Sequence, residues 1–387
     1  ELRLASEVSV DVMGSDVVLE AGGGNVRCDV GVLSLLNACR QPTPLSVAVE
    51  NSAGGAAIDW METTALVLKL VEAGVLVADG EEIELPAEAT NYEAPRMHLV
   101  MLDDAPRTLG YVEAIRELVQ PGDVVVDVGT GSGLLAIAAA QAGASRVYAI
   151  ERSGIADVAE HMFYQNGVSD RITLLRGQST DIELPERADV MVSELVGDEP
   201  LAERILELTA DAVKRFMKPN ARYVPRGLTI KAQGMRVSAS LLERHVCQPA
   251  LLARWKDAYG IDFSPLGEVS PDRFYLTPAQ LAGHLEPVTD VATFRYVDLC
   301  DPAVSYTADA VVVATCDGPI DAIVSWFELD LDGKRTVDTS PFGADPSCHW
   351  RCPIWLVDPM TTLTRQQRLG LHYRRNYTRA ELDITFA

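Results

Sequence analysis

The feature that most constrains the fold of this 387-residue chain is a short apolar run leading into a glycine-rich loop. The run Val124–Val128 shows little alternation, as expected of a parallel strand that is buried on both faces. Gly129-Thr130-Gly131-Ser132-Gly133 follows it, and then the helical stretch Leu134–Ala142. Glycines let the backbone turn sharply and approach a ligand closely. The pattern predicts a βα unit with a ligand at the turn; the alternative is a turn without one.

The residues around this unit continue the alternation of strand and helix. The predicted elements are a strand, a helix and two further strands, at Arg146–Ile150, Ile155–Gln165, Ile172–Leu175 and Val190–Val192. Repeated βα units with right-handed crossovers give a doubly wound parallel sheet. We therefore expect an α/β fold with a Rossmann-like domain over residues 89–225.

Residues 226–387 change character. Short apolar or alternating runs separated by Asp-Gly and Pro turns dominate, among them Val311–Ala314, Ala322–Leu329 and Ile354–Val357. This pattern predicts an all-β, β-barrel-like domain fused behind the sheet.

Residues 1–88 form a third segment. Short apolar runs at Val8–Val12 and Val17–Leu19, helical spacing over Trp60–Ala73 and a hairpin pattern at Val75–Leu85 predict a small winged-helix-like α+β module. In pattern the segment is similar to the PqqD-like leader-peptide-recognition domains of peptide-modifying enzymes. That resemblance implies capture of a substrate segment, for example by adding it as a strand to the sheet of the module.

An acid follows the glycine loop at the distance that a nucleoside site needs. Glu151 ends the next predicted strand, 22 residues after Gly129, where a carboxylate can accept both ribose hydroxyls. With Asp127 before the GxGxG loop, the pattern predicts the S-adenosyl-L-methionine pocket of a class I methyltransferase. The alternative for Asp127 is a structural helix-cap acid. The expected cofactor-binding residues of this pattern are Asp127, Gly129, Thr130, Gly131, Gly133 and Glu151.

Two glutamates stand where the fourth predicted strand ends. Glu194 lies in a Ser-Glu-Leu-Val-Gly sequence, and Glu203 follows nine residues later. Ligands bind at the carboxyl edge of such a sheet. Two carboxylates on one loop repel each other unless a cation lies between them, and a guanidinium is suited because its planar donors meet carboxylates bidentately. The alternative is two solvated acids at a helix start.

Four separated motifs in one unbroken order resemble the protein arginine N-methyltransferases, over roughly residues 89–387. The glutamate pair matches the double-glutamate loop of that family, and Cys348-His349-Trp350 matches its Thr-His-Trp loop. Trp255 and Tyr259-Gly260-Ile261-Asp262 match a further segment. The family's Tyr-x5-His-x2-Met-Leu-x-Asp-x2-Arg stretch is matched by Tyr92, His98, Met101, Leu102, Asp104 and Arg107.

The resemblance implies roles for these residues. The implied catalytic residues are Glu194, Glu203 and His349, the histidine as a general base. The implied substrate-binding residues are Tyr92, Met101 and Trp350. His98 and Arg107 would bind the cofactor, Arg107 through the methionine carboxylate, and Thr180 replaces a family glutamate that contacts adenine. The family's usual tryptophan, methionine and tyrosine are missing from the glutamate loop, which leaves the target and the number of methyl transfers open.

The segment after Asp262 implies a homodimer. In the family a dimerisation arm follows here, which corresponds to about residues 265–286. Thr277-Pro278 predicts a helix start, and Leu281 and Leu285 then fall one turn apart on an apolar contact face. The alternative for that face is an internal core helix.

Charge and cysteine content restrict the partners. The formal net charge is −23, and the first 90 residues hold 4 Lys and Arg against 15 Asp and Glu. Such a field repels phosphate backbones and anionic lipid, so we expect neither a nucleic-acid nor a membrane partner. The seven scattered cysteines predict reduced thiols and no zinc or other metal site. With no apparent secretory signal or membrane span, the expected location is cytoplasmic.

Three functions stay open at this stage. The first is an arginine N-methyltransferase of a peptide or protein, such as a ribosomal natural-product precursor peptide. The second is a methyltransferase of free arginine or another small guanidino metabolite. The third is a non-catalytic binding scaffold. One observation argues against it, namely that the chain has all five expected site residues: Asp127, Glu151, Glu194, Glu203 and His349.

Overall fold

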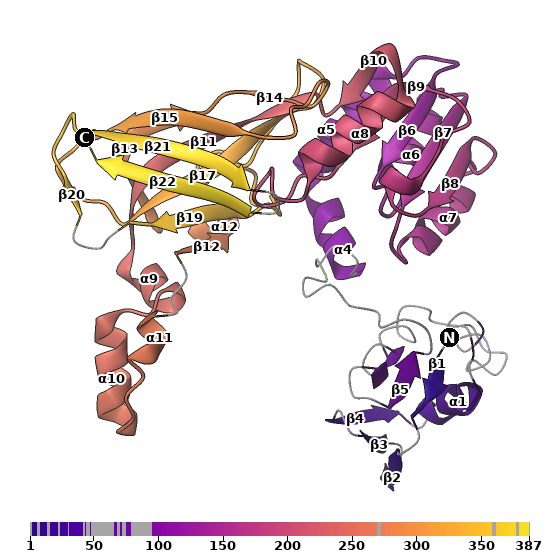
Figure 1. The fold of residues 1–387 in the computed structure, drawn as a ribbon, viewed down its shortest axis with the longest axis horizontal. Helices are drawn as coiled ribbons and strands as arrows, with labels where there is room; N and C mark the ends of the chain where they lie inside the picture. Colours follow the sequence, from indigo (N-terminus) through magenta and orange to yellow (C-terminus); the bar gives the residue numbers. More distant parts are fainter. Residues whose placement is uncertain are drawn as a thin grey trace. The chain divides into compact units, whose positions relative to one another are not determined.

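The structure is a computed structural model. It describes residues 2–5, 8–13, 16–21, 24–29, 31–41, 43, 47, 66–67, 70–71, 75–78, 95–268, 272–357, 361–376 and 379–386. The chain divides into two compact units, Glu1–Pro95 and Arg96–Ala387, each described below by itself (Figure 1).

The first unit is an α+β module with its own core. Strands β2 (Ser9–Met13), β3 (Asp16–Ala21) and β4 (Gly24–Asp29) form an antiparallel meander that leads into helix α1 (Val32–Ala38). The core is apolar and includes Leu2, Val17, Leu19, Leu35, Leu36, Val67, Leu70 and Leu76.

The first strand of this unit pairs with the last strand described in it. Strand β1 (Leu2–Leu4) lies antiparallel to β5 (Leu76–Ala78). The predicted strands near Val10 and Val18 are present, whereas the second strand of the hairpin predicted at Val75–Leu85 lies outside the described residues. The winged-helix assignment stays a prediction.

The second unit begins with a parallel sheet of five strands. Their spatial order is β10 (Met217–Val224), β9 (Ala188–Ser193), β6 (Val124–Val128), β7 (Arg146–Glu151) and β8 (Ile172–Arg176). All neighbouring pairs are parallel, which confirms the predicted doubly wound sheet. From β6 the chain builds outward through β7 and β8 and then returns to β9 on the other side. The strand order therefore reverses between β6 and β9.

Helices α5 (Ala105–Leu118), α6 (Leu134–Gln141), α7 (Ala156–Gln165) and α8 (Ile205–Phe216) cover this sheet (Figure 1). Helix α4 (Pro95–Asp103) precedes α5 and lies apart from the faces of the sheet, and the short 3-10 helix η2 (Ser179–Asp181) follows β8. Helix α6 is rich in alanine, and residues 135–140 are all buried. Small side chains let this helix lie close to the sheet, so the glycine loop before it is held against the strand ends.

The remaining strands form the predicted β-rich domain. The larger sheet runs β12 (Arg273–Leu276), β19 (Cys352–Leu356), β17 (Ala322–Asp330), β11 (Gly227–Val237) and β13 (Leu285–Thr293), with β14 (Val297–Asp298) and β18 (Thr336–Asp338) at its side. The smaller sheets are β15 (Thr307–Val313), β21 (Arg368–Asn376) and β22 (Arg379–Phe386), and β16 (Gly318–Pro319) with β20 (Thr362–Leu363).

One continuous core joins the parallel sheet to the β-rich domain. Ile115 and Val190 from the first part belong to the same buried cluster as Leu228 and Phe327 from the second. Because protein interiors are close-packed, this shared core fixes the strand ends of the sheet against the loops of the barrel-like domain. The observed architecture is a doubly wound parallel sheet followed by a barrel-like domain, as the sequence predicts.

A helical projection leaves the barrel-like domain (Figure 1). It consists of α9 (Ala239–His245), α10 (Pro249–Tyr259) and α11 (Pro265–Glu268). Helix α10 has no buried residue, and Tyr259 and Ile261 at its end are exposed. Its apolar side chains Leu251, Leu252 and Trp255 are only half-buried.

Helices α9 and α10 of this projection lie earlier than the arm predicted at residues 265–286, and only α11 falls within that range. Most of that range belongs to the barrel-like domain, because β12 pairs with β19 and β13 begins at Leu285. The predicted helix start is present: Thr277 caps α12 (Pro278–Leu281) in a capping box. The helix ends after one turn, so the predicted pairing of Leu281 with Leu285 on one helical face is wrong.

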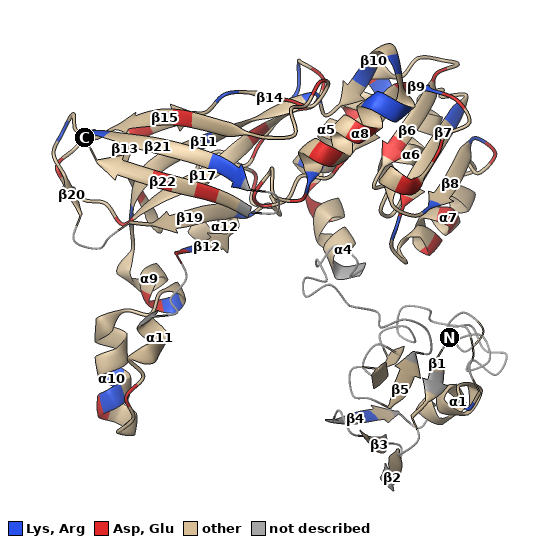
Figure 2. Cartoon of the chain, in the orientation of Figure 1, with Lys and Arg blue, Asp and Glu red and all other residues tan. Residues whose placement is uncertain are grey.

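The described surface of the second unit carries both charges. Acidic and basic residues are interspersed along the same helices and strands (Figure 2). Within the described ranges, no helix combines the length and the apolar character that a membrane crossing requires.

Candidate active site

The predicted ligand loop lies at the carboxyl ends of β6 and β9, where the strand order reverses. Open α/β sheets bind ligands at such a reversal. Gly129, Gly131 and Gly133 all have positive φ angles, of +77°, +54° and +92°. A Cβ atom on Gly129 would lie 2.8 Å from Cδ2 of Leu195, on the glutamate loop. The position therefore requires a glycine for both its backbone angle and its close contact.

Glu151 is bound to this loop. It ends β7, is 9% exposed, and its two oxygens accept the backbone N–H groups of Gly131 and Ser153, each at 2.9 Å. A carboxylate has about four acceptor positions, so capacity remains for hydroxyls of a ligand. The sequence spacing predicted a carboxylate beside the loop, and the structure places it there.

Asp127 lies fully buried at the end of β6. One oxygen accepts the hydroxyl of Thr130 at 2.6 Å, and the other, Oδ1, has no hydrogen-bond partner in the described part of the chain. Burial raises the pKa of Asp127 to about 7, against the lowering effect of Thr130 and of the backbone of Ala136 in the first turn of α6. One oxygen of Asp127 thus binds near the start of α6, in agreement with the alternative of a structural helix-cap acid. The other oxygen can accept a hydrogen bond from a ligand.

Three residues reach the site from the junction of α4 and α5. Asp104 is the N-cap of α5 and accepts the backbone N–H of Arg107 at 3.2 Å. The Arg107 guanidinium donates to the carbonyl of Met101 at 3.1 Å. All three residues are buried, with exposures of 1%, 6% and 8% for Asp104, Arg107 and Met101. The capped helix start therefore fixes the guanidinium beside the strand ends.

Arg107 forms an ion pair with Glu194. The distance from Nη2 of Arg107 to Oε2 of Glu194 is 2.7 Å, with the two side chains 8% and 12% exposed. Burial lowers the pKa of Arg107, but Glu194, Tyr111 and Asp104 together outweigh it and the net pKa is raised. The other oxygen of Glu194 accepts the backbone N–H of Val196 at 3.3 Å. Nε of Arg107 is buried and has no partner in the described residues.

His349 forms a second buried pair, with Asp104. Nδ1 of His349 lies 2.8 Å from Oδ2 of Asp104, which also accepts the backbone N–H of His349 at 3.1 Å. Burial raises the pKa of Asp104, but the bonds and the charge of His349 outweigh this and the net pKa is lowered. Sequence reasoning had placed Asp104 in a matching motif without giving it a role. The available signal was its capping position three residues before Arg107.

Glu203 folds back over Gly197. A Cβ atom on Gly197 would lie 2.3 Å from Oε1 of Glu203 and 2.9 Å from its Cδ. The residue after the glutamate, Arg204, has φ +60°, an uncommon left-handed angle for a side-chain-bearing residue. The sharp turn and the glycine bring the second glutamate against the loop that begins at Glu194. The alternative of two solvated acids does not describe Glu194, which is buried and paired.

Trp350 packs under the loop that contains Glu194 and hydrogen-bonds to it. It is 1% exposed, and its indole N–H donates to the carbonyl of Val196 at 2.7 Å. Its ring lies against His349, with centroids 4.5 Å apart, and 5.7 Å from the guanidinium carbon of Arg107. A fully buried side chain offers no surface to a substrate. In this structure Trp350 supports the loop, and its predicted substrate-binding role stays a prediction.

Three further residues were predicted to bind the cofactor or the substrate: His98, Thr180 and Tyr92. His98 on α4 lies over the glycine loop, since a Cβ atom on Gly131 would lie 3.0 Å from its Cε1. Thr180 is exposed in η2 after β8, and its hydroxyl donates to Asp181 at 3.3 Å. Tyr92 lies outside the described residues.

Comparison with known proteins places this geometry in a family. A family model described as ribosomal protein L11 methyltransferase (PrmA) matches residues 104–251. Protein arginine N-methyltransferase 1 of Saccharomyces cerevisiae is 30% identical over 279 residues, covering 68% of this chain and 76% of that protein. The chain belongs to the protein arginine N-methyltransferase family.

Two further proteins are similar to most of the chain. The arginine N(omega)-methyltransferase of Streptomyces achromogenes subsp. streptozoticus is 28% identical over 327 residues, covering 80% of this chain and 86% of that protein. The structure of the Trypanosoma brucei PRMT1 enzyme–prozyme heterotetrameric complex with AdoHcy matches with a TM-score of 0.66 at 25% identity, over 77% of this chain and 95% of that one. The chain spans 55% to 62% of the length of the plant histone-arginine methyltransferases that it matches.

Proposed function

We propose that this protein is an S-adenosyl-L-methionine-dependent N-methyltransferase that acts on an arginine guanidinium of a peptide or protein. The observation that carries the proposal is the loop from Glu194 to Glu203. It presents two carboxylates at the ligand-binding edge of the sheet, and Glu194 already accepts a guanidinium N–H, that of Arg107. Membership of the arginine N-methyltransferase family supports the same chemistry.

The residues at the strand ends fit the cofactor. The buried atoms without a partner in the described residues include Nε of Arg107 and Oδ1 of Asp127, a donor and an acceptor. Arg107 would bind the methionine carboxylate, and Glu151 would accept the ribose hydroxyls against the glycine loop. The solved relative with AdoHcy supports this assignment. When bound, the cofactor supplies a sulfonium methyl group whose S–C bond breaks as an N–C bond forms, leaving S-adenosylhomocysteine.

The two glutamates would orient the substrate guanidinium and balance its positive charge. A guanidinium is a poor nucleophile while its lone pairs are delocalised. Glu194 and Glu203 would hold it from two sides, so that one terminal nitrogen faces the methyl group. Positioning of this kind is worth up to about 7–11 kcal/mol.

The methylated nitrogen must lose one proton. Because Nδ1 of His349 is bound to Asp104, its Nε2 is the atom that would accept this proton. The Asp104 carboxylate fixes the orientation of the ring and stabilises the imidazolium that results. His349 and Asp104 thus act as the general base and its support.

The N-terminal unit is proposed to capture the peptide. Strand β2 is at an edge of its three-stranded meander, where an extended segment can add as a further strand. The acidic composition of the first 90 residues favours a basic, arginine-containing partner and disfavours nucleic acid.

A second candidate is methylation of free arginine or another small guanidino metabolite. It is favoured by the Streptomyces relative, whose name is arginine N(omega)-methyltransferase and which matches 80% of this chain. In this case residues 1–88 would serve assembly.

One assay separates these candidates. The protein, the cofactor and either arginine-containing basic peptides or free arginine are incubated, and products are read by intact mass. Matched peptides with lysine in place of arginine are the control. We expect the mass of the arginine-containing peptides to increase by one or more methyl groups, and the mass of the lysine-containing control peptides to stay unchanged. Methylation of free arginine but of no peptide would establish the second candidate, and no product on any guanidino compound would refute both.

We also propose a homodimer in the cytoplasm. Exposed Tyr259, Ile261 and Leu266 on the projection α9–α11 suit packing against a second copy of the chain. All seven cysteines are free, as in a reducing compartment. Light scattering at low micromolar concentration tests the assembly, and a fully active monomer would refute it.

A further inference from the structure

The loop between the two glutamates carries two acids that the mechanism does not use. Asp198 and Glu199 follow Gly197 directly, and each forms an ion pair with an arginine of the barrel-like domain. Neither acid is free to bind a substrate. Their position between Glu194 and Glu203 raises the question of what these pairs do for the site.

Glu199 is the deeper of the two. It is 6% exposed, lies 3.3 Å from Nε of Arg273, and accepts the hydroxyl of Tyr275 at 2.8 Å through the same oxygen. Its other oxygen accepts the backbone N–H of Ala380 at 3.1 Å. Burial raises the pKa of Glu199, and Arg273 opposes that rise. Strands β12 and β22 thus hold this carboxylate from two directions.

Asp198 is tied to the segment that carries the general base. It accepts the backbone N–H and Nε of Arg351, each at 2.7 Å, and Nη2 of Arg351 at 2.5 Å. Arg351 follows His349 by two residues. The ring of Tyr275 lies 5.7 Å from the guanidinium carbon of Arg351, so the two ion pairs share one aromatic support.

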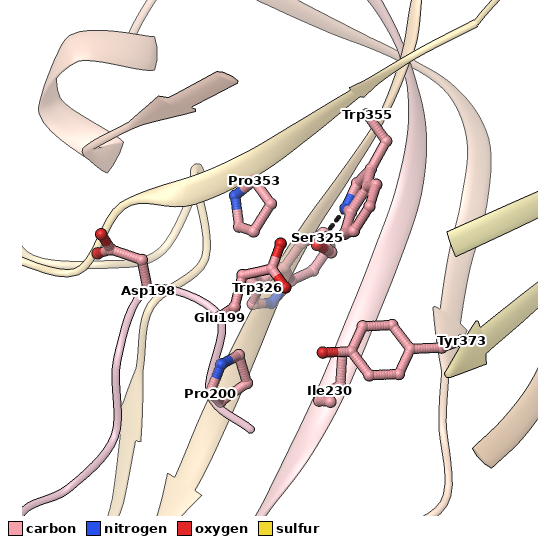
Figure 3. Close-up of a pocket in the computed structure, with 9 residues that line it drawn as sticks. All are labelled: Asp198, Glu199, Pro200, Ile230, Ser325, Trp326, Pro353, Trp355 and Tyr373. Atoms are coloured by element: carbon pink, nitrogen blue, oxygen red, sulfur yellow. Dashed lines mark hydrogen bonds between the residues drawn. The ribbon is translucent and has the colours of Figure 1, made fainter. Parts of the chain in front are cut away.

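A small pocket lies between residues 198–200 and the strands of the barrel-like domain, lined in part by Pro200, Trp326 and Tyr373 (Figure 3). The Tyr373 hydroxyl points into it and has no partner among the described residues. The two ion pairs are polar contacts that hold this part of the loop to the barrel-like domain.

We propose that the Glu199–Arg273 and Asp198–Arg351 pairs position the catalytic loop. They anchor it to the barrel-like domain at its middle, so that Glu194 and Glu203 face one guanidinium at a fixed separation. Glu199, Arg273, Asp198 and Arg351 are positioning residues. They touch neither the substrate nor the cofactor in this scheme. The inference rests on the proposed methyl transfer, because the position of the loop matters through the two glutamates.

The test compares a single variant with a charge-balanced double variant. Glu199→Gln leaves the largely buried Arg273 with only the exposed Asp272, 3.9 Å away, as an anion, which can destabilise the fold on its own account. Glu199→Gln with Arg273→Met removes both charges and should restore most of the lost stability. If the pair positions the loop, kcat falls about tenfold in both variants while the Kd of S-adenosylhomocysteine stays within about twofold. Asp198→Asn, at a more exposed pair, should lower kcat by a smaller factor.

The matched control is Arg236→Met with Glu286→Gln, an exposed Arg–Glu pair between β11 and β13 that lies 2.8 Å apart. It should leave kcat unchanged. Hydrogen exchange of the 194–203 segment gives a readout that does not need turnover, and we expect it to speed up about tenfold in the Glu199 variants alone. Wild-type kcat and exchange in the stable double variant would overturn the proposal. A wild-type protein that methylates no guanidino compound would refute the proposed function, while exchange would still decide whether the pairs hold the loop.

Discussion

The closest test of the loop geometry is the substitution Gly197→Ala. The new Cβ atom would lie 2.3 Å from Oε1, 2.9 Å from Cδ and 3.3 Å from Cγ of Glu203. Carbon and oxygen atoms in contact keep about 3.3 Å or more, so the carboxylate must move by roughly 1 Å. The backbone of Gly197 does not have a positive φ, so alanine fits it without strain.

The expected effect is therefore on aim and not on folding. A displacement of about 1 Å at a catalytic group can cost about a hundredfold in rate, and we expect kcat to fall by that factor. The melting temperature and the affinity for S-adenosylhomocysteine should stay near those of the wild type. Gly154→Ala is the matched control, because its Cβ atom would have no neighbour within 4 Å.

Rates are measured at saturating cofactor with an arginine substrate identified by mass. A Gly197→Ala enzyme with the kcat of the wild type would show that Glu203 does not act from the place it occupies. A large loss of melting temperature would mean that the loop, and not the carboxylate alone, gives way.

Three further predictions concern the cofactor pocket and the N-terminal unit. Glu151→Ala should weaken the binding of S-adenosylhomocysteine by about 1.5–3 kcal/mol in calorimetry, and unchanged affinity would remove Glu151 from the pocket. Since the pKa of Asp127 is raised from 3.8 to about 7, the ligand-free fold holds this proton more tightly than the unfolded chain, and its contribution to stability is lost as the pH rises from about 4 through 7. Asp127→Asn should flatten that fall in denaturant unfolding, and an unaltered pH profile would contradict the shift. Deleting residues 1–88 should raise KM for a long peptide but leave turnover of a short arginine compound, whereas normal handling of the long peptide would favour the small-molecule candidate.

Local patterns predicted the cofactor edge of the sheet well. A buried strand, a glycine loop and a carboxylate at the next strand end are contiguous in sequence, and their geometry follows from the parallel sheet itself. Hence Gly131 and Glu151 meet as the spacing indicates. The local pattern left the glutamate loop open, and its resemblance to the double-glutamate motif of the family singled it out.

Contacts made across the shared core could not be predicted in the same way. The pairs Asp104–His349 and Glu199–Arg273 join segments that the sequence pattern leaves far apart. They depend on how the barrel-like domain packs on the sheet, which no periodicity encodes. The same holds for Trp350. The motif match predicted that it lies near the site, but not that its side chain is buried.

The arm illustrates the limit of capping signals. Thr277 does cap a helix, but a cap fixes where a helix begins and not how long it runs. The spacing of Leu281 and Leu285 fits a helical turn. Leu285 nevertheless lies in β13, because that strand pairs with β11 in the sheet.

The measurement that tests the account most directly is the single-turnover rate of arginine methylation by Glu203→Gln. This variant is preferable to Glu194→Gln, because Glu194 also holds Arg107 and its loss would disturb the cofactor side. At saturating cofactor, with an arginine peptide that the wild type methylates, we predict a rate at least about a hundredfold lower, or ~2.7 kcal/mol, with unchanged affinity for S-adenosylhomocysteine. A rate near that of the wild type would contradict the claim that the two glutamates hold and aim the guanidinium.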